Sequence, residues 1–251
     1  MLFSIIIPSY NQGKYIRKTL DNLVELKRIA EGVSIEILLF DNKSNVDVQT
    51  IIKEYAPHLS YYEIEEDKGQ FDAINKGILK CKGDYWTWLN TDDYIHVEGF
   101  LNLVNQLLEK PDIDYIYGNI DYMDENDKFL FTVKSIPLAL NTLINKNPGI
   151  YQPGSFFKKT FTDKLGLLKS YRCCFDFEFI LRCLKNNAVV FQCDFSVALF
   201  RYHQESKTGS LISVFIKEQL KISADYGRRA FSFLTIFSYL RLLKHKIFSR
   251  K

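Results

Sequence analysis

The stretch FSIIIPSYN at residues 3–11 is a run of apolar side chains that stops at a proline and gives way to polar residues. The chain repeats this pattern, because an apolar run at 35–40 ends at Asp41 and another at 84–89 ends at Asn90. Short apolar runs bounded by turn-forming residues are typical of buried strands. The sequence therefore predicts strands whose carboxyl ends carry polar groups.

Amphipathic stretches separate these runs, and their apolar residues recur at the spacing of a helix. They lie at residues 14–30, 48–55 and 71–80, and another apolar run at 59–64 predicts one more strand. Alternating strands and helices predict a parallel sheet with right-handed crossovers. The fold class is therefore α/β, with a Rossmann-like, mostly parallel central sheet flanked by helices and followed by C-terminal helices.

The second part of the chain is less regular and has no internal repeat. The elements expected there are strands at 115–122, 129–133, 150–157 and 189–200, and helices at 177–184, 211–226 and 231–248. The expected organisation is one domain over 1–210, with halves at 1–110 and 111–210, and a helical appendage over 211–251.

Polar side chains gather where the expected strands end. Pro8 and Tyr10 follow the first strand, Asp41 ends the second, and Asn90 to Asp93 follow the fourth. In open α/β sheets, ligands bind beyond the carboxyl ends of the strands. We therefore expect these groups to converge on one ligand site.

The adjacent carboxylates Asp92 and Asp93 have two interpretations. Such a pair repels itself unless a cation or a hydrogen-bond donor intervenes, and hard divalent ions take one or two carboxylates together with substrate phosphates. A helix is also expected near Val97, and aspartate is favoured at helix N-termini. Both interpretations, a metal site and a helix cap, stay open from these residues alone.

Asp41 also has two interpretations. It can bind a ribose or a base, as an aspartate at the end of a second parallel strand often does, or it can form a turn, since Asp-Asn-Lys-Ser suits a turn. The chain has neither of the two common glycine-rich phosphate loops. Phosphate would therefore have to be held by a metal ion, which favours the carboxylate interpretation of the segment at 90–93.

Composition excludes several classes of protein. The net charge of +3 is too small to predict nucleic-acid binding. Five cysteines without paired spacing argue against a disulfide framework or a zinc site, and so favour a reducing, cytoplasmic compartment. The first apolar run lacks a basic flank and is too short for a signal peptide, and no apolar stretch is long enough to predict a membrane-spanning helix.

Four blocks of the sequence resemble one family. FSIIIPSYNQGKYIRKTLDNL, IEILLFDNKS, DKGQFDAINKGILKCKGDYWTWLNTDDY and FDFEFILR are similar to the family 2 glycosyltransferases, in the family's order and spacing, over roughly residues 3 to 205. The resemblance implies the GT-A fold, with a nucleotide-binding first half and an acceptor-binding second half. The central block looks like the subgroup that builds bacterial surface polysaccharides.

The resemblance implies roles for residues of the nucleotide half. Pro8 and Tyr10 match the block that lines the base, and Asp41 matches the acid that binds the base or ribose. Lys68 and Asp72 match a block that lies against the nucleotide.

The family's D-x-D position is occupied by Asn90-Thr91-Asp92. The resemblance makes Asp92 the ligand of a divalent metal ion, Mn²⁺ or Mg²⁺. Asn90 replaces the usual acid and can bind a ribose hydroxyl instead. Asp93 is assigned to the nucleotide sugar, and it would have to contribute if two carboxylates hold the metal.

The resemblance also makes Asp176 the catalytic base. Glu178 stays an alternative, although residues two apart do not share a helix face, so only one of the two should face the site. An unperturbed aspartate has a pKa of about 3.9, so Asp176 is expected to be ionised without special tuning. His203 is a candidate for the metal or diphosphate, against the simpler expectation of a surface or core histidine. Gln152 and Ser155 are weaker candidates for the acceptor.

The function implied is inverting transfer of a sugar from a nucleotide diphosphate, with UDP expected by family habit, to a hydroxyl of a glycan or lipid-linked acceptor. Two alternatives remain, a non-catalytic nucleotide-sugar-binding protein and a nucleotidyltransferase. The first alternative is supported by Asn90 and by Phe175, each of which stands where the family usually has an acid. The second expects a glycine- and arginine-rich loop where this chain has PSYNQGKYIRK.

The segment 231–248, FSFLTIFSYLRLLKHKIF, is strongly apolar and then basic. A basic amphipathic helix suits the inner face of a cell membrane. A helix packed on the domain, or on a second subunit of a homodimer, is the alternative.

Overall fold

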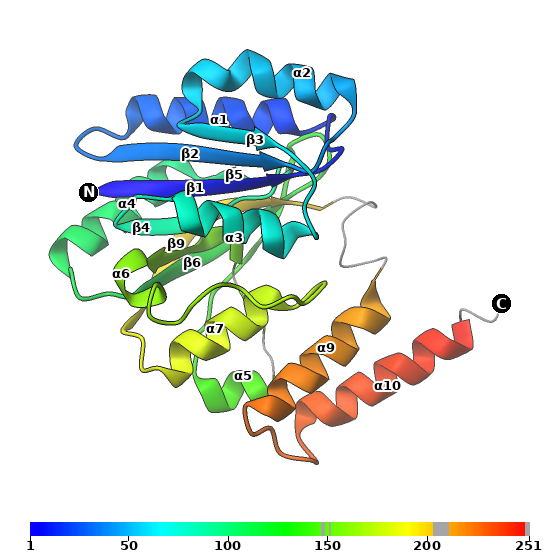
Figure 1. Cartoon of the computed structure of the whole chain (residues 1–251). Helices are drawn as coiled ribbons and strands as arrows, with labels where there is room; N and C mark the ends of the chain where they lie inside the picture. The colour runs from blue at the N-terminus through cyan, green and yellow to red at the C-terminus, as the bar shows by residue number, and fades with distance from the viewer. Residues whose placement is uncertain (147–148, 151, 203–210, 249–251) are drawn as a thin grey trace.

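A computed structural model describes residues 1–146, 149–150, 152–202 and 211–248 (Figure 1). Its centre is a nine-stranded sheet in the order β3-β2-β1-β4-β8-β6-β9-β5, with β7 paired to β6. Helices cover both faces of this sheet. The α/β prediction is confirmed, although the sheet is parallel in its first half and mixed in its second.

The first half forms as the apolar pattern predicts. Its strands are β1 (Leu2–Ser9), β2 (Ser34–Asp41), β3 (Tyr61–Ile64) and β4 (Tyr85–Trp88), and its helices are α1 (Ile16–Ile29), α2 (Val46–Tyr55), η1 (Ala56–His58) and α3 (Gln70–Lys80). The four strands pair in parallel. Their carboxyl ends therefore lie along one edge, as the sequence predicts.

The second half continues the sheet with antiparallel and parallel neighbours. Its elements are β5 (Tyr94–Ile95), α4 (Val97–Glu109), β6 (Tyr115–Met123), β7 (Phe129–Val133), α5 (Leu140–Lys146), η2 (Gln152–Gly154), β8 (Ser155–Lys158), α6 (Lys159–Thr162), α7 (Phe175–Lys185) and β9 (Val190–Arg201). β8 runs antiparallel between β4 and β6, so it joins the two halves into one sheet. β6 and β9 pair in parallel.

One predicted strand is wrong in part. The expected strand at 150–157 begins only at Ser155, because the preceding Gln152–Gly154 is a short 3-10 turn. Pro153 within that turn has no N–H to donate to a sheet, which explains the late start. The turn brings Gln152 against the carboxyl end of β4, where Gln152 bonds to the carbonyl of Trp88.

Two apolar cores lie on the two faces of the sheet. One packs α1, α2 and α4 against it, and the other packs α3, α5 and α7. The C-terminal helices are α9 (Ile212–Asp225) and α10 (Phe233–Phe248). Ile222 of α9 is fully buried in the second core, so α9 is packed into the domain, and Figure 1 shows α10 lying along its outer side. Over the described residues, no helix is both long and apolar enough to cross a membrane.

Candidate functional site

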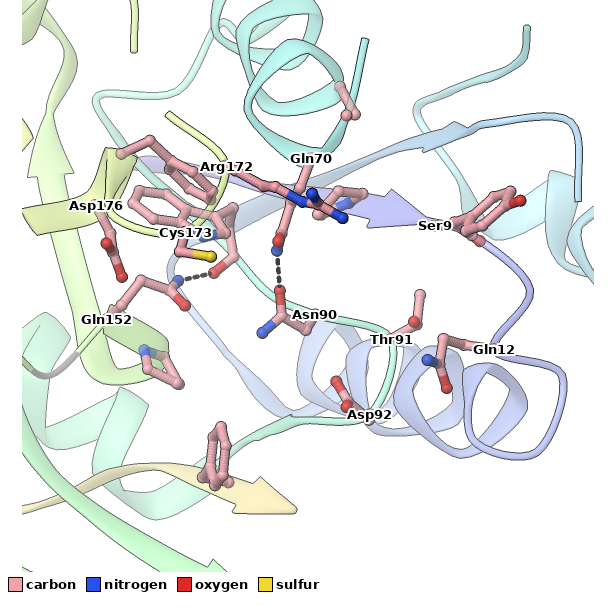
Figure 2. A pocket seen from close by; sticks show the side chains of 18 of the residues that line it. Ser9, Gln12, Gln70, Asn90, Thr91, Asp92, Gln152, Arg172, Cys173 and Asp176 are labelled. Atoms are coloured by element: carbon pink, nitrogen blue, oxygen red, sulfur yellow. Dashed lines mark hydrogen bonds between the residues drawn. The ribbon is translucent and has the colours of Figure 1, made fainter. Parts of the chain in front are cut away.

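A cleft of about 620 Å³ lies at the carboxyl ends of β1, β2 and β4, and the second half of the chain closes its other side (Figure 2). Six of the residues selected from the sequence line it: Pro8, Tyr10, Asn90, Asp92, Gln152 and Asp176. They come from segments up to about 170 positions apart in the sequence. The expected convergence of polar strand ends is therefore observed.

The end of the cleft beside β1 and β2 carries hydrogen-bonding groups beyond the six selected residues. Gln12, Asn42 and Asp67 all line it. Asn42 Oδ1 accepts from the N–H of Asp67 at 3.0 Å, and Asp67 Oδ1 accepts from the N–H of Gly69 at 2.7 Å. Burial is the main reason that the pKa of Asp67 is raised above its ordinary value. These bonds fix the Asp67 carboxylate in the lining of the cleft, to which the exposed Tyr10 also belongs.

Asp41 lies one layer behind the cleft. It is 1% exposed, and it accepts hydrogen bonds from Ser9 Oγ at 2.8 Å and from Ser44 through both its N–H and its Oγ. The predicted direct contact of Asp41 with the nucleotide is not supported by this position. Its carboxylate instead ties the end of β2 to Ser9, which does line the cleft.

Lys68 and Asp72 are also displaced from the cleft by a short distance. The N–H of Lys68 donates to Asp72 Oδ2 at 3.0 Å, which satisfies a free donor at the start of α3. Neither residue lines the cleft, whereas their neighbours Asp67, Gly69 and Gln70 do. The block therefore contributes to the cleft through residues other than Lys68 and Asp72.

The two adjacent carboxylates face opposite ways. Asp92 lines the cleft, while Asp93 is fully buried and accepts from Asn90 Nδ2 at 3.0 Å and from the N–H of Arg201 at 3.1 Å. Burial, with the charge of Asp92, raises the pKa of Asp93 well above its ordinary value, and Arg201 opposes this. The prediction that Asp93 binds the nucleotide sugar is not supported, because its side chain holds the segment to β9.

Asn90 is held in place as well. Its Oδ1 accepts from Gln70 Nε2 at 2.6 Å, so the amide bridges α3 and Asp93 (Figure 2). Within the described residues, no three histidine, cysteine, aspartate or glutamate side chains form a metal-binding group. Of the two carboxylates in this segment, Asp92 is the one that lines the cleft, and His203 lies outside the described residues.

Asp176 lies in the first turn of α7, across the cleft from Asp92, and Asn90 is drawn between them in Figure 2. The pKa of the Asp176 carboxyl is raised to about 7, mainly because burial removes water from it. A hydrogen bond from the N–H of Phe177 acts in the opposite direction and lowers the pKa. The expectation of an ordinary, fully ionised carboxylate is therefore wrong. The reason is that the fold buries this carboxyl, and desolvation disfavours its charged form.

Glu178 does not face the cleft. Its side chain is 1% exposed and pairs with Arg182 at 2.8 Å and Lys169 at 2.8 Å, and it accepts from the hydroxyl of Tyr226 at 2.8 Å. Only one of the two acids therefore points into the site, as helix geometry requires. Gln152 lines the cleft and donates to the carbonyl of Trp88 at 2.7 Å. Ser155 is buried against the hydroxyl of Tyr115 and does not line the cleft.

The second half adds an apolar and cationic wall to the cleft. Tyr122, Phe200 and Phe215 line it together with Arg172 and Cys173. None of these was selected from the sequence, where only the high aromatic content pointed to stacking surfaces. Phe215 belongs to α9, so a helix expected in an appendage contributes directly to the site.

Glu218 of α9 anchors the loop that precedes Asp176. Its Oε1 accepts from the N–H of Arg172 at 2.8 Å, and its Oε2 accepts from the N–H groups of Cys173 at 2.8 Å and Cys174 at 3.1 Å. These donors stand just before α7, where backbone N–H groups have no partner within the helix. The carboxylate therefore fixes both the start of α7 and the loop that carries Arg172.

Glu218→Gln is expected to lower turnover about tenfold to a hundredfold and stability by about 2 kcal/mol, since charged hydrogen bonds of this kind contribute about 1.5–3 kcal/mol each. In the variant, the NH₂ group of glutamine would replace one carboxylate oxygen and would face backbone N–H groups that have an acceptor in the wild type. Ligand affinity at the end of the cleft beside β1 and β2 should change less than threefold, because the partners of Glu218 belong to another segment, residues 172–174. Lys217→Ala, at an exposed position on the same helix, is the control. Unchanged turnover in Glu218→Gln would contradict the anchoring role.

Residues 4–182 match the family model described as "Glycosyl transferase family 2". An uncharacterized glycosyltransferase of Rickettsia bellii is 32% identical over 136 residues, a stretch covering 53% of this chain and 19% of that protein. The matched stretch covers between 19% and 41% of five Rickettsia relatives, so the chain corresponds to less than half of their length.

Solved structures share the fold. S. aureus TarS 1–349 in complex with UDP-GlcNAc superposes with a TM-score of 0.64 at 17% identity, covering 90% of this chain and 71% of that one. The mannosyltransferase PcManGT from Pyrobaculum calidifontis, in complex with GDP-Man and Mn²⁺, gives a TM-score of 0.61 at 15% identity, covering 90% and 73%. These similarities show the GT-A type of fold, and the family match spans more than half of the sequence. The chain belongs to glycosyl transferase family 2.

Proposed function

We propose that the protein transfers a sugar from a nucleoside diphosphate to an acceptor hydroxyl, with inversion at the anomeric carbon. One observation carries the proposal: Asp92 and Asp176, from the two halves of the fold, line the same cleft from opposite sides. Inverting transfer needs a site that binds diphosphate and a separate base that receives the acceptor proton. A cleft with one carboxylate at each side suits that division.

The donor binds along the first half of the cleft. Pro8 and Tyr10 offer a surface for the base, and Asp67 offers a fixed acceptor for an N–H of its edge. UDP is the proposed nucleotide, and the UDP-GlcNAc complex of TarS supports it. GDP remains the main competitor, because PcManGT binds GDP-Man on the same fold.

A divalent cation, Mn²⁺ or Mg²⁺, fits this arrangement if its ligands are one protein carboxylate and oxygens of the substrate. Asp92 would hold it, and hard cations of this kind complete their shell with waters and phosphates. The Mn²⁺ complex of PcManGT supports the assignment. A cation held there would neutralise charge on the leaving diphosphate. A two-carboxylate site is not proposed, since Asp93 is turned into the protein.

The chain's own groups carry the remaining steps. Asp176 receives the proton of the acceptor hydroxyl while that oxygen bonds to the anomeric carbon and the bond from this carbon to the phosphate oxygen breaks. Arg172 and Gln70 line the middle of the cleft, where their donors can bond sugar or phosphate oxygens (Figure 2). Glu218 keeps Asp176 positioned through the start of α7.

The raised pKa of Asp176 predicts a rate that depends on pH. The base must be unprotonated, so kcat/KM is expected to rise with pH and level off above an apparent pKa of about 7. A profile of kcat/KM from pH 5 to 9 at constant ionic strength checks this. A flat profile down to pH 5 would mean that the base is an ordinary, solvated carboxylate or another group.

The acceptor is proposed to be a hydroxyl of a glycan or of a lipid-linked saccharide. The aromatic wall of Tyr122, Phe200 and Phe215 supports a sugar ring, because aromatic faces pack against the apolar faces of sugars. Assembly of a bacterial surface polysaccharide at the inner face of the cell membrane is the proposed setting.

Nucleotide binding and product formation together test the proposal. The melting temperature is measured with UDP, GDP and dTDP, each with and without Mn²⁺, because ligands that bind only the folded state raise it. UDP with Mn²⁺ should give the largest shift. Release of nucleoside diphosphate is then measured with a cell-envelope extract as acceptor. Binding without acceptor-dependent release would favour a non-catalytic nucleotide-sugar-binding protein instead.

A further inference from the structure

The outward face of α10 is apolar and largely exposed. Phe233, Ile236, Phe237 and Leu240 recur at the spacing of one helix face, and Phe231 precedes them. These five side chains are between 48% and 93% exposed. The rings of Phe233 and Phe237 stack with their centroids 5.8 Å apart. Contiguous exposed apolar surface of this kind marks an interaction site.

The opposite face of α10 already has its partners. Leu234 and Ser238 are buried, and α10 packs against α9 and α5. Just before the helix, the N–H of Arg229 donates to Asn145 Oδ1 at 3.0 Å. The inner face of α10 therefore holds the helix on the domain, and its outward face stays exposed in the structure.

The charge around this face is of one sign. From Tyr226 to Lys251 the sequence contains seven lysines and arginines and no aspartate or glutamate. Arg229 and Arg241 are exposed, and the guanidinium of Arg241 lies 5.8 Å from the ring centroid of Phe237. The partner must therefore offer apolar depth together with negative charge.

We propose that this surface, defined as the α10 outer face (Phe231, Phe233, Ile236, Phe237 and Leu240 with Arg229 and Arg241), docks on an anionic phospholipid membrane. Its aromatic and aliphatic side chains enter the boundary between headgroups and acyl chains, and its arginines contact lipid phosphates. A second copy of the chain is a poorer occupant. A symmetric dimer through this face would bring two sets of like charges together.

The docking surface is separated from the cleft by a single helix. α9 packs against α10 and also supplies Phe215 to the cleft and Glu218 to the loop before Asp176. Membrane docking would therefore hold the cleft beside the lipid surface. The docking inference itself stands on the α10 outer face and is independent of the reaction proposed for the cleft.

Sedimentation with vesicles tests the proposal on the full chain. Vesicles of phosphatidylcholine with about 30% phosphatidylglycerol are compared with vesicles of pure phosphatidylcholine, because the electrostatic contribution comes only from anionic lipid. The apolar variant is Phe233→Ser with Phe237→Ser, and the charge variant is Arg229→Gln with Arg241→Gln. The matched control is Phe129→Ser with Leu130→Ser, which removes exposed apolar side chains from β7 beside the acidic residues Asp124, Glu125 and Asp127.

The proposal predicts that the wild type and the β7 control sediment with anionic vesicles, and that both α10 variants bind at least tenfold more weakly. Binding should weaken with added salt. All substituted side chains are exposed, and a thermal melt of each variant verifies folding. Equal sedimentation of the folded apolar variant and the wild type would overturn the proposal. Absence of vesicle binding by the wild type would also overturn it. So would a wild type that is a dimer by light scattering and does not bind vesicles, if the apolar variant is a monomer.

Discussion

Asp176→Asn is expected to lower kcat by about 10²–10⁴-fold, the usual contribution of a positioned general base, while nucleotide affinity stays within about twofold. The asparagine keeps the size of the side chain and removes its ability to take a proton. Asp176 and the nucleotide end lie on different sides of the cleft, so donor binding should persist. Steady-state kinetics and a nucleotide titration of the same preparation measure the two effects separately.

The same variant should also be more stable than the wild type at alkaline pH. The pKa of Asp176 is about 7 in the folded protein, above the unfolded value of about 3.9, so the folded state binds more protons between these values. The stability contributed by this carboxyl is complete at low pH and is lost as the pH rises towards 7. Asparagine does not titrate, so the variant should gain about 1–3 kcal/mol relative to the wild type between pH 4 and 8.

A surface substitution, Asp194→Asn, is the control for both readouts and should leave them unchanged. Near-normal turnover in Asp176→Asn would remove Asp176 from the mechanism. A variant that is inactive and also destabilised at every pH would point to a structural role for this carboxylate.

Asp92→Asn is expected to abolish the effect of Mn²⁺ on nucleotide binding, and to lower kcat/KM at least about 100-fold by loss of charge stabilisation at the leaving group. The adjacent position provides a matched control. Asp93→Asn keeps a side chain of the same shape where the carboxylate is buried against Asn90 and the N–H of Arg201. That variant should retain the metal dependence, whatever its change in stability.

Calorimetric titration of UDP with Mn²⁺ and with chelator, on both variants, distinguishes the two carboxylates. Loss of metal dependence only in Asp92→Asn supports the assignment. Equal loss in both variants would show that the pair acts together, and retention in Asp92→Asn would place the cation elsewhere.

The sequence predicts the first half of the fold well because that half depends on local pattern. β1 and β2 are apolar runs with clear ends, and α1 and α3 show a regular apolar face, so their order leaves little choice of topology. The position of β8 between β4 and β6 could not be predicted in this way. It depends on pairing between segments about 40 to 70 residues apart, which leaves no local pattern.

The site shows the same limit at the level of single side chains. The segment 90–93 is identifiable from the sequence, but only the contacts with Arg201, more than a hundred residues away, show that Asp93 turns inward. The raised pKa of Asp176 depends on burial of its carboxyl, which only tertiary packing produces. Glu218 could not be selected, because its partners lie 44 to 46 residues earlier in the chain.

The most direct test of the central claim is release of nucleoside diphosphate from nucleotide sugars in the presence of Mn²⁺ and an envelope extract as acceptor. We predict release from a UDP-sugar that requires both the extract and Mn²⁺ and that falls to background in Asp176→Asn. Release that is equal in the wild type and in Asp176→Asn, or absence of release from UDP-, GDP- and dTDP-sugars alike, would contradict the account.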